Sequence, residues 1–422
     1  MKLASFTPIS YFLLLCCSMF CSPYFHNSFV VGTRPPSTCS GPAQGYRGML
    51  VAPRYGPCSP VGHEKSYAVS TQILHKDKLR VRFINTLAFS RKYVLDAHGK
   101  KTHQLRIPGK GLGAGNYVVT PGVGTPARDF KLTIDTGSHD TWIRCEPGLK
   151  SSSTFRKLPC DNNCTNSIKY FDGSKVEGFW ASDTLTISPS YSIKQFNFVC
   201  VNRTKINGLL ALGPGDNSLA TRTNVFCHCL PSEDATGYLL FGPEAREICR
   251  VGKFTPLNPQ EDSGRYLVNF VGISVGNKTL KISHATSSSP GTMIDSGTVI
   301  TRLPLPVYKQ FRTVFRKLME EYSLVKRPPS EDLLETCYEL KGYKYSTVKI
   351  PAVVLHFENI DINLDGSQVL WKEGKSPVYC LAFAGNKNDD HMVIIGNHQL
   401  QKLNVLYDIQ KRSMGIGPGN CG

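Results

Sequence analysis

The feature that most constrains this chain is a short sequence that occurs twice. LTIDTGS occupies residues 132–138 and TMIDSGT occupies residues 292–298, so Asp135 and Asp295 lie 160 residues apart. Each copy ends an apolar run with the same order of residue types: apolar, Asp, Ser or Thr, Gly, Ser or Thr. A strand followed by an Asx turn would give the same pattern, because Asp accepts hydrogen bonds from its own backbone there. Two copies spaced by one lobe favour a chain of two related halves, each carrying one aspartate.

Two carboxylates brought together across an interface have a defined chemistry. They cannot both ionise cheaply, so they share one proton and titrate as a pair. The ionised carboxylate can then take a proton from a bound water while the protonated one donates to a scissile carbonyl. Glycine after each aspartate lets backbone N–H groups approach, and Ser138 and Thr298 can donate to the outer carboxylate oxygens. The pattern predicts amide hydrolysis with no covalent intermediate, metal ion or cofactor.

The pattern of the chain from Asn116 onwards is typical of an all-β architecture. Short runs with period-2 alternation are broken by Gly, Pro, Asn and Asp every eight to twelve residues. One helix is predicted over residues 306–322, with Tyr308, Phe311 and Phe315 on its apolar face. Strands and helices do not alternate, which argues against a doubly wound nucleotide-binding fold.

The N-terminus is predicted to be a secretory signal peptide over residues 1–22. Lys2 precedes the apolar run ISYFLLLCCSMF, which is too short to cross a bilayer, and small residues follow it. Twelve cysteines remain after this segment, scattered instead of grouped as C-x-x-C pairs, so disulfides are favoured over a zinc site. The sequons at Asn163, Asn202 and Asn277 agree with an extracytoplasmic route and are the expected glycosylation sites.

The positive charge of the chain is concentrated near its N-terminus. The net charge is +17 over 422 residues, and residues 31–114 carry +11 of it. This stretch contains a predicted amphipathic helix that begins at Ser70 and has Leu79, Phe83 and Leu87 on its apolar face. A glycine run over residues 109–115 follows and is interpreted as a flexible junction. These features together predict a basic, cleavable pro-segment.

With these motifs in place, the chain resembles the pepsin-like (A1) aspartic endopeptidases, and among them the plant nepenthesin-type, atypical group. The similarity extends from about Gly113 to the C-terminus. The matching segments are IDTGSHDTW, YFDGS, FCHCLPS, LLFG, MIDSGTVITRLP, ETCYEL, YCLAFAGN and IIGNHQLQKLNVLYD. The resemblance implies an all-β, bilobal pepsin-like fold with the active-site cleft between two β-barrel-like lobes. The implied segments are a signal peptide (1–22), a pro-segment (23–112), an N-terminal lobe (113–255) and a C-terminal lobe (256–422).

The resemblance also implies roles for individual residues. Asp135 and Asp295 would form the catalytic dyad, with Trp142 hydrogen-bonding Tyr170 at the tip of a flap hairpin. The residues implied to support the dyad are Thr136, Gly137, Ser138, Ser296, Gly297 and Thr298. The implied disulfides pair Cys337 with Cys380 and Cys229 with Cys421. Six further cysteines allow fifteen pairings, among which the sequence does not choose: Cys145, Cys160, Cys164, Cys200, Cys227 and Cys249.

Some positions depart from the family pattern. The cysteine-rich insert after the first motif is short, Phe171 stands where the flap usually has glycine, and Ala211 replaces the glycine that corresponds to Gly396. A Cβ at Ala211 could crowd the chain beside the first aspartate. The G-x-S-x-G match at residues 272–276 is interpreted as a strand and hairpin turn, so Ser274 is not expected to be a nucleophile.

Three function classes follow. The favoured one is a secreted aspartic endopeptidase made as a zymogen, monomeric, with the basic pro-segment lying over an acidic cleft. It would act on protein or peptide substrates in the extracellular space (apoplast) or vacuole, with the chloroplast less favoured and no membrane partner. The alternative is a catalytically weakened or inactive pepsin-like binding or inhibitor protein. Nucleic-acid binding is disfavoured in the mature form, because only +5 remains on residues 115–422.

Overall fold

The fold is described from a computed structural model of the whole chain. The chain divides into two units, Met1–Pro35 and Pro36–Gly422, and everything described below belongs to the second. The described residues are 39, 46–61, 70–89, 117–145, 147–159, 167–169, 175–201, 207–258, 265–282, 291–328, 333–388 and 391–421. The expected signal peptide and several expected site residues lie outside these ranges, namely Tyr170, Phe171, Asn163, Asn202, Cys160 and Cys164.

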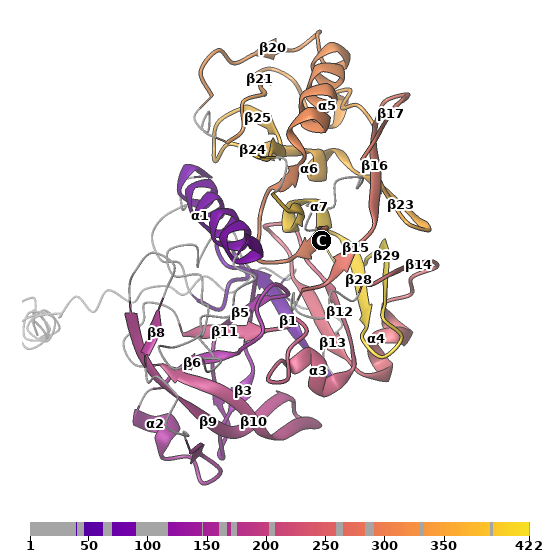
Figure 1. Cartoon of the computed structure of the whole chain (residues 1–422). Coiled ribbons are helices and arrows are strands. Elements are labelled where there is room, and N and C mark those ends of the chain that lie inside the picture. The colour runs from indigo at the N-terminus through magenta and orange to yellow at the C-terminus, as the bar shows by residue number, and fades with distance from the viewer. Residues whose placement is uncertain are drawn as a thin grey trace, which may run out of the picture. The chain divides into compact units, whose positions relative to one another are not determined.

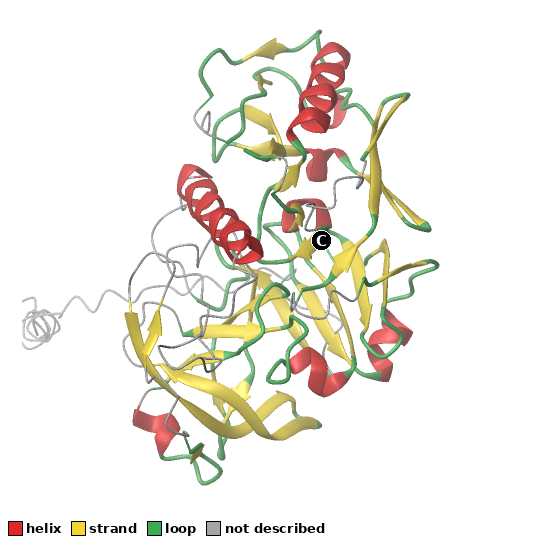
Figure 2. Cartoon of the chain, in the orientation of Figure 1, coloured by secondary structure: helices red, strands yellow, loops and turns green. Residues whose placement is uncertain are grey.

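The described chain is mostly β-structure, as the sequence pattern predicts (Figure 2). Its largest sheet has 16 strands, mainly from the N-terminal half but completed by two strands from the C-terminus. In spatial order the strands are β14 (Phe254–Pro256), β29 (Ser413–Pro418), β28 (Leu403–Asp408), β12 (Val225–Cys229), β13 (Gly237–Phe241), β1 (Gly48–Pro53), β2 (Tyr117–Val119), β5 (Leu132–Asp135), β11 (Gly208–Ala211), β6 (Trp142–Arg144), β10 (Tyr191–Val201), β9 (Lys175–Ser188), β3 (Gly122–Val123) and β4 (Arg128–Asp129). Two short strands, β7 (Arg156–Lys157) and β8 (Ser167–Lys169), also pair with β9.

The C-terminal half adds three smaller sheets. The first, which carries the second aspartate, contains β15 (Leu267–Val268), β18 (Thr292–Asp295), β27 (Val393–Gly396), β19 (Thr301–Leu303) and β26 (Phe383–Gly385). The second contains β17 (Lys278–Lys281), β16 (Phe270–Val275), β22 (Val353–Phe357) and β23 (Ile360–Leu364). The third contains β20 (Ser323–Leu324), β21 (Cys337–Glu339), β25 (Val378–Leu381) and β24 (Leu370–Lys372). The pairings among the described strands close no barrel, so the lobes are sheets that pack together.

Helices are few, and two of them are long. The short ones are α2 (Pro147–Lys150), α3 (Leu219–Thr223), α4 (Pro243–Ile248), α6 (Gly366–Val369), α7 (Asn397–Leu400) and the 3₁₀ turn η1 (Tyr345–Thr347). The long ones are α1 (Ser70–Phe89) and α5 (Leu305–Leu318). Helix α5 buries Tyr308, Phe311 and Phe315, the apolar face that periodicity predicts.

The repeated motif is built in the same way in both halves. Strand β5 pairs in parallel with β11, which sets Ala211 beside Asp135, and β18 pairs in parallel with β27, which sets Gly396 beside Asp295. The backbone N–H of Ala211 donates to the Thr141 hydroxyl at 3.1 Å, and the N–H of Gly396 donates to Thr301 at 3.0 Å. The two aspartates therefore end equivalent strands. Ala211 is fully buried and keeps this pairing.

Part of the expected pro-segment is built into this framework. Strand β1 pairs antiparallel with β13 through Gly48–Val51 and with β2 through Ala52 and Pro53. Helix α1, from the same segment, lies between the strands of the N-terminal half and the elements of the C-terminal half (Figure 1). The sequence indicates the helix but gives no sign that β1 pairs within the sheet.

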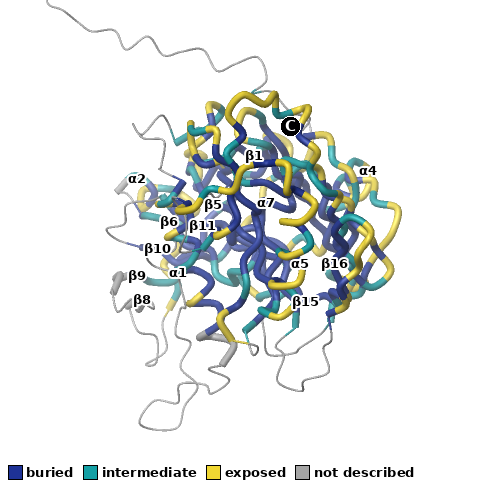
Figure 3. Tube along the Cα trace, turned by 90° about the horizontal axis from the view of Figure 1, so that it is seen from above, coloured by how far each residue is buried: buried dark blue, intermediate teal, exposed yellow. Residues whose placement is uncertain are grey.

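Five disulfides fasten the described chain. Two are the pairs that the resemblance implies, Cys337–Cys380 and Cys229–Cys421. Two more, Cys145–Cys200 and Cys227–Cys249, join cysteines whose pairing the sequence leaves open, and the fifth is Cys39–Cys58. Buried residues run through the middle of the trace, and exposed residues lie mainly in the outer loops and turns (Figure 3).

Candidate active site

The two aspartate loops are joined to each other by their own side chains. The Thr136 backbone N–H donates to the Ser296 hydroxyl at 3.1 Å, and the Ser296 N–H donates to the Thr136 hydroxyl at 2.9 Å. A Cβ on Gly297 would lie 2.7 Å from Asp135 Oδ1, and a Cβ on Gly137 would lie 2.9 Å from Asp295 Oδ1. Glycine is therefore required at both positions for each loop to approach the opposite aspartate.

Each aspartate is also held by the residues that follow it. Asp135 Oδ1 accepts from the Gly137 N–H at 2.9 Å, and Oδ2 accepts from the Ser138 hydroxyl at 2.5 Å. Asp295 Oδ1 accepts from the Gly297 N–H at 3.0 Å, and Oδ2 accepts from the Thr298 hydroxyl. Both carboxylates are almost completely buried, at 1% and 0% exposure. Sequence reasoning expected these supporting residues to lie around the two aspartates, and the structure brings all of them together there.

A cation from helix α1 lies between the two carboxylates. Arg80 Nη2 donates to Asp135 Oδ1 at 2.7 Å and to Asp295 Oδ1 at 2.8 Å. Its Nη1 donates to Asp135 Oδ2 at 2.9 Å, and its Nε donates to Asp295 Oδ2 at 3.0 Å. One guanidinium thus engages all four oxygens of the pair, the fork geometry for which arginine is suited. Arg80 and the burial of both aspartates thus close these four oxygens to solvent.

The electrostatics of this cluster are dominated by burial and by Arg80. Burial favours the neutral guanidinium, but the two carboxylates outweigh it and raise the pKa of Arg80 above its ordinary value. Burial, opposed by Arg80 and assisted by the charge of Asp295, raises the pKa of Asp135. Burial acts the same way on Asp295, but Arg80 and the hydrogen bonds from Thr298 and Gly297 hold its pKa below the ordinary value. With Arg80 in place, the pKa values of the two aspartates are therefore shifted in opposite directions.

Helix α1 is fixed at a second polar point one turn before Arg80. Asp77 is fully buried, and its Oδ1 accepts from the Val299 backbone N–H at 2.6 Å. Its Oδ2 accepts from Arg302 Nη2 at 2.7 Å. Near the other end of the helix, Asn85 Oδ1 accepts from the Met392 N–H at 3.0 Å.

Apolar contacts of α1 lie on both sides of these polar groups. Ile73 and Leu74 belong to a buried cluster with residues of the C-terminal half: Val299, Ile300, Leu334, Cys337, Val378, Cys380, Ala382 and Ala384. Val81 and Ile84 belong to another, with Leu267, Met293, Met392 and Ile394. The helix thus covers the aspartates with a face that combines apolar and charged residues.

The sequence predicts the helix but only part of the face that it buries. Leu79, predicted on the apolar face, is only half-buried, whereas Arg80, which that prediction leaves out, is 3% exposed. Phe83 is buried as expected, and the side chain of Leu87 lies outside the described set. The error has a physical cause, because a helix that covers two carboxylates buries a cation, which hydrophobic periodicity scores as surface.

The flap prediction falls partly outside the described residues. Trp142 is buried, at 1% exposure, and its Nε1 has no hydrogen-bond partner within the described chain. Tyr170, its expected partner, lies outside that part of the chain, so the Trp142–Tyr170 bond stays a prediction. Of the three sequons, Asn277 alone is described, and it is exposed in the turn between β16 and β17.

The G-x-S-x-G serine has polar neighbours that deserve a separate test. Ser274 Oγ lies 2.6 Å from His356 Nε2, and His356 Nδ1 lies 2.7 Å from Asp361 Oδ1, an order that resembles a hydrolytic triad. However, Ser274 lies within β16, between β17 and β22, so both edges of its strand are engaged in ladders. A nucleophile elbow needs a sharp turn into a helix and free N–H groups for an oxyanion. The three residues are therefore a cross-strand polar row on a sheet.

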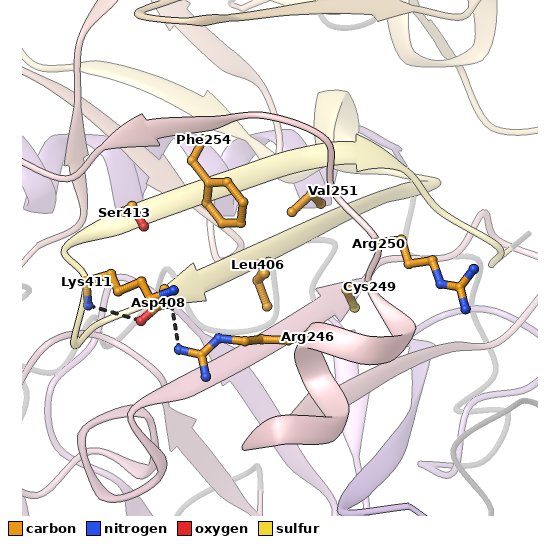
Figure 4. A pocket seen from close by; sticks show the side chains of 9 residues that line it. All are labelled: Arg246, Cys249, Arg250, Val251, Phe254, Leu406, Asp408, Lys411 and Ser413. Atoms are coloured by element: carbon orange, nitrogen blue, oxygen red, sulfur yellow. Dashed lines mark hydrogen bonds and ion pairs between the residues drawn. The ribbon is translucent and has the colours of Figure 1, made fainter.

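The described chain also has a hollow away from the aspartates. Its volume is about 350 Å³, and the strands β28 and β29 with helix α4 border it (Figure 4). Its lining residues are Arg246, Cys249, Arg250, Val251, Phe254, Leu406, Asp408, Lys411 and Ser413. Arg246 Nη2 donates to Asp408 Oδ2 at 2.6 Å, and Arg250 and Lys411 leave the lining with an excess of positive charge. Neither aspartate of the repeated motif lines this hollow.

Within the ranges given above, no group of three or more His, Cys, Asp or Glu side chains is placed to hold a metal ion. None of the helices there is long and apolar enough to cross a membrane.

Comparisons with known proteins agree with this geometry. A family model described as "Xylanase inhibitor N-terminal" matches residues 117–163 and 149–243, and one described as "Xylanase inhibitor C-terminal" matches residues 265–418. The Arabidopsis thaliana protein named aspartyl protease AED1 is 35% identical over 88% of this chain and 86% of its own. Aspartic proteinase nepenthesin-2 of Nepenthes gracilis is 28% identical over 74% of this chain and 79% of its own. The crystal structure of basic 7S globulin from soybean superposes with a TM-score of 0.59 at 20% identity, over 72% of this chain and 93% of that protein, which shows a shared fold.

Proposed function

This chain belongs to the plant pepsin-like (A1) aspartic proteases, and from that premise we propose that it is the precursor of an endopeptidase whose dyad is Asp135 and Asp295. The observation that carries the proposal is the contact of Arg80 with all four oxygens of the two aspartates. A buried cation of that geometry is stabilised only where two carboxylates face each other. In a fold that had lost either carboxylate, the buried guanidinium of Arg80 would be incompletely paired.

The proposed reaction is the hydrolysis of a peptide bond by water held between the two carboxylates. Paired carboxylates that share a proton are the established pattern of aspartic proteases. Once Arg80 has left, we infer that the ionised aspartate takes a proton from the water and the protonated one donates to the peptide carbonyl. Ser138 and Thr298, which donate to Oδ2 of their aspartates, fix the orientation of the carboxylates. The mutual hydrogen bonds of Thr136 and Ser296 keep the two loops at a constant separation.

The zymogen part of the proposal rests on which segment supplies Arg80. Helix α1 lies in the basic region that precedes the matched family models, which begin at residue 117. Substrate cannot reach the dyad until this helix moves, so we infer that removal of the segment containing α1 generates the active enzyme. The five disulfides support passage through an oxidising compartment, consistent with the proposed secretory route to the apoplast or vacuole.

The experiment is cleavage of a denatured protein by the acid-treated protein between pH 3 and pH 7. We expect acid-dependent cleavage that pepstatin inhibits and that the Asp295→Asn variant lacks. The matched control is the Asp361→Asn variant, which also removes one carboxylate, but from the cross-strand row of Ser274, His356 and Asp361. This variant should cleave like the wild type. Absence of cleavage by a folded, processed wild-type protein would refute the proposed protease activity. It would favour the alternative, a catalytically inactive binding or inhibitor protein.

A further inference from the structure

We propose that Arg302 determines substrate specificity in the processed enzyme by binding an acidic side chain close to the bond that is cleaved. This inference rests on the proposed function, because it requires α1 to leave the cleft. The contact that suggests it is the one that α1 now makes. Asp77 places its carboxylate against Arg302 Nη2 at 2.7 Å and against the Val299 backbone N–H at 2.6 Å.

Arg302 belongs to the body of the enzyme and remains when α1 departs. It lies on β19, which pairs with β26 on one side and with β27 on the other. Its Nη1 donates to the Ile300 carbonyl on the same chain segment, which holds the guanidinium in place. Asp77, in contrast, is carried away with the helix.

When Asp77 leaves with α1, Arg302 loses the carboxylate with which it is paired. Arg302 is 3% exposed and Asp77 is 0% exposed in the closed precursor. Breaking a buried ion pair by removing one partner is strongly unfavourable, because the remaining charge is left without compensation. Arginine cannot lose its charge to relieve this cost. A carboxylate that arrives with the substrate restores both the charge balance and the hydrogen bond to Val299, whereas an amide side chain restores only the hydrogen bonding.

The position of Asp77 locates the acidic residue along the substrate. Asp77 precedes Arg80 by three residues, which corresponds to about 4.5 Å along a helix. An extended chain advances about 3.3 Å per residue. A substrate side chain that replaces Asp77 should therefore belong to a residue within about two positions of the bond held between the aspartates.

The ionisation of the substrate gives the proposal a pH signature. A free Asp or Glu side chain titrates near pH 4, whereas arginine side chains as a class keep their charge throughout the acid range. The groups that face the Arg302 guanidinium from the packed elements are Asp77 of α1 and the Ile300 carbonyl, and only the former is ionisable. The preference for an acid over its amide should thus be weak at pH 3 and strong at pH 5.5.

The test uses the self-processed protein and matched peptides that differ only by Asp or Asn. Asp is exchanged for Asn at each of the two positions on either side of the cleaved bond, and kcat/KM is measured at pH 3 and pH 5.5. At one of these positions we expect Asp to be preferred about ten-fold at pH 5.5, the scale of a charge-assisted hydrogen bond. In Arg302→Gln the ratio should fall to about one, and in Arg302→Lys it should stay above one.

Controls separate specificity from folding. The double variant Asp77→Asn/Arg302→Gln leaves no unpaired charge in the precursor, so it decides the outcome if Arg302→Gln alone does not fold. Asp77→Asn alone and Arg312→Gln, on α5, should both keep the wild-type ratio after processing. Equal cleavage of the Asp and Asn peptides by the wild type at all four positions overturns the inference while leaving the protease intact, as does a ratio that persists in Arg302→Gln. Failure of the wild type to cleave any peptide overturns both.

Discussion

At the scale of single residues, the aspartate pair is defined by what touches each carboxylate. Asp135 and Asp295 have equivalent hydroxyl and backbone donors, but their pKa values are shifted in opposite directions. Arg80 compensates both charges in a place where water cannot. Its removal should therefore affect the precursor more than the loss of any other basic residue of α1.

Arg80→Gln should release the dyad without removing the helix. The variant leaves two buried carboxylates facing each other with no cation. Removing one partner of a buried ion pair destabilises the state that contains it, here the closed precursor, by about 3–5 kcal/mol. We expect the unprocessed variant to cleave a denatured substrate at a pH at which the wild-type precursor is silent. Lys76→Gln, which changes a half-buried lysine four residues earlier on the same helix, is the control and should behave as the wild type. A precursor that stays equally silent with Gln at position 80 would show that α1 inhibits without this contact.

Gly396 and Ala211, which pair with the two aspartates, should differ in how well they tolerate substitution. A Cβ on Gly396 would lie 2.4 Å from the Val299 carbonyl oxygen, which belongs to a backbone held by the second motif. Gly396→Ala should lower the free energy of unfolding by about 1–3 kcal/mol, as overpacked cores do, measured by urea denaturation. Ala211→Gly, at the equivalent place in the first half, should change it by about 1 kcal/mol or less. Equal costs at the two positions would contradict the claim that the close approach of Val299 is what excludes a Cβ at Gly396.

At the scale of elements, the sequence predicts more of the strands than of their partners. Period-2 runs locate most strands, and the repeated motif places both aspartates at strand ends, because these signals are local. The pairing of β1 with β13 and β2 is not predictable, since it joins segments far apart in the chain and carries no local pattern. The roles of Arg80 and Asp77 are not predictable for the same reason, because each side chain pairs with an oppositely charged group from a distant part of the chain.

Helix α1 should act as an inhibitor when supplied as a separate peptide. Its described contacts combine two apolar clusters with three polar points, all on residues 73–85, so a peptide of residues 70–89 contains all of these groups. We expect competitive inhibition of the processed enzyme in steady-state assays. An Arg80→Gln peptide should be weaker by about ten-fold or more, the scale of hydrogen bonds to a charged group. A Lys76→Gln peptide should match the native one, and equal inhibition by all three peptides would contradict the assignment.

At the scale of the whole molecule, acid acts on the closed state and on the fold in separate ways. The pKa of Asp295 is held low with α1 in place, so its contribution to closure is present above the ordinary carboxyl value and is lost as the pH falls through the lowered one. Asp135, whose pKa is raised, contributes below the ordinary value and less as the pH rises. Closure should accordingly weaken on acidification through Asp295.

His228 sets a different acid limit, on the fold itself. Burial lowers its pKa to about 3, so the folded chain binds fewer protons than the unfolded chain between that value and about 6.5, and stability falls as the pH is lowered through this window. The disulfides of Cys227 and Cys229 flank it and oppose unfolding. His228→Phe should move the acid unfolding midpoint to lower pH in circular dichroism titrations, with His75→Phe, at an exposed position, leaving it unchanged. A midpoint that does not move would mean that other groups limit acid stability.

The central claim is that the chain is an aspartic protease precursor closed by its own helix, and the most direct measurement follows that helix after acidification. The purified precursor is shifted from pH 7 to pH 4, and the loss of residues 70–89 is followed by mass spectrometry in the wild type and in Asp295→Asn. The account predicts that the wild type loses residues 70–89 and that substrate cleavage appears at the same time. The Asp295→Asn variant should retain the segment. Shedding by the folded Asp295→Asn protein at the wild-type rate, or a wild type that stays intact and folded at pH 4, would contradict the claim.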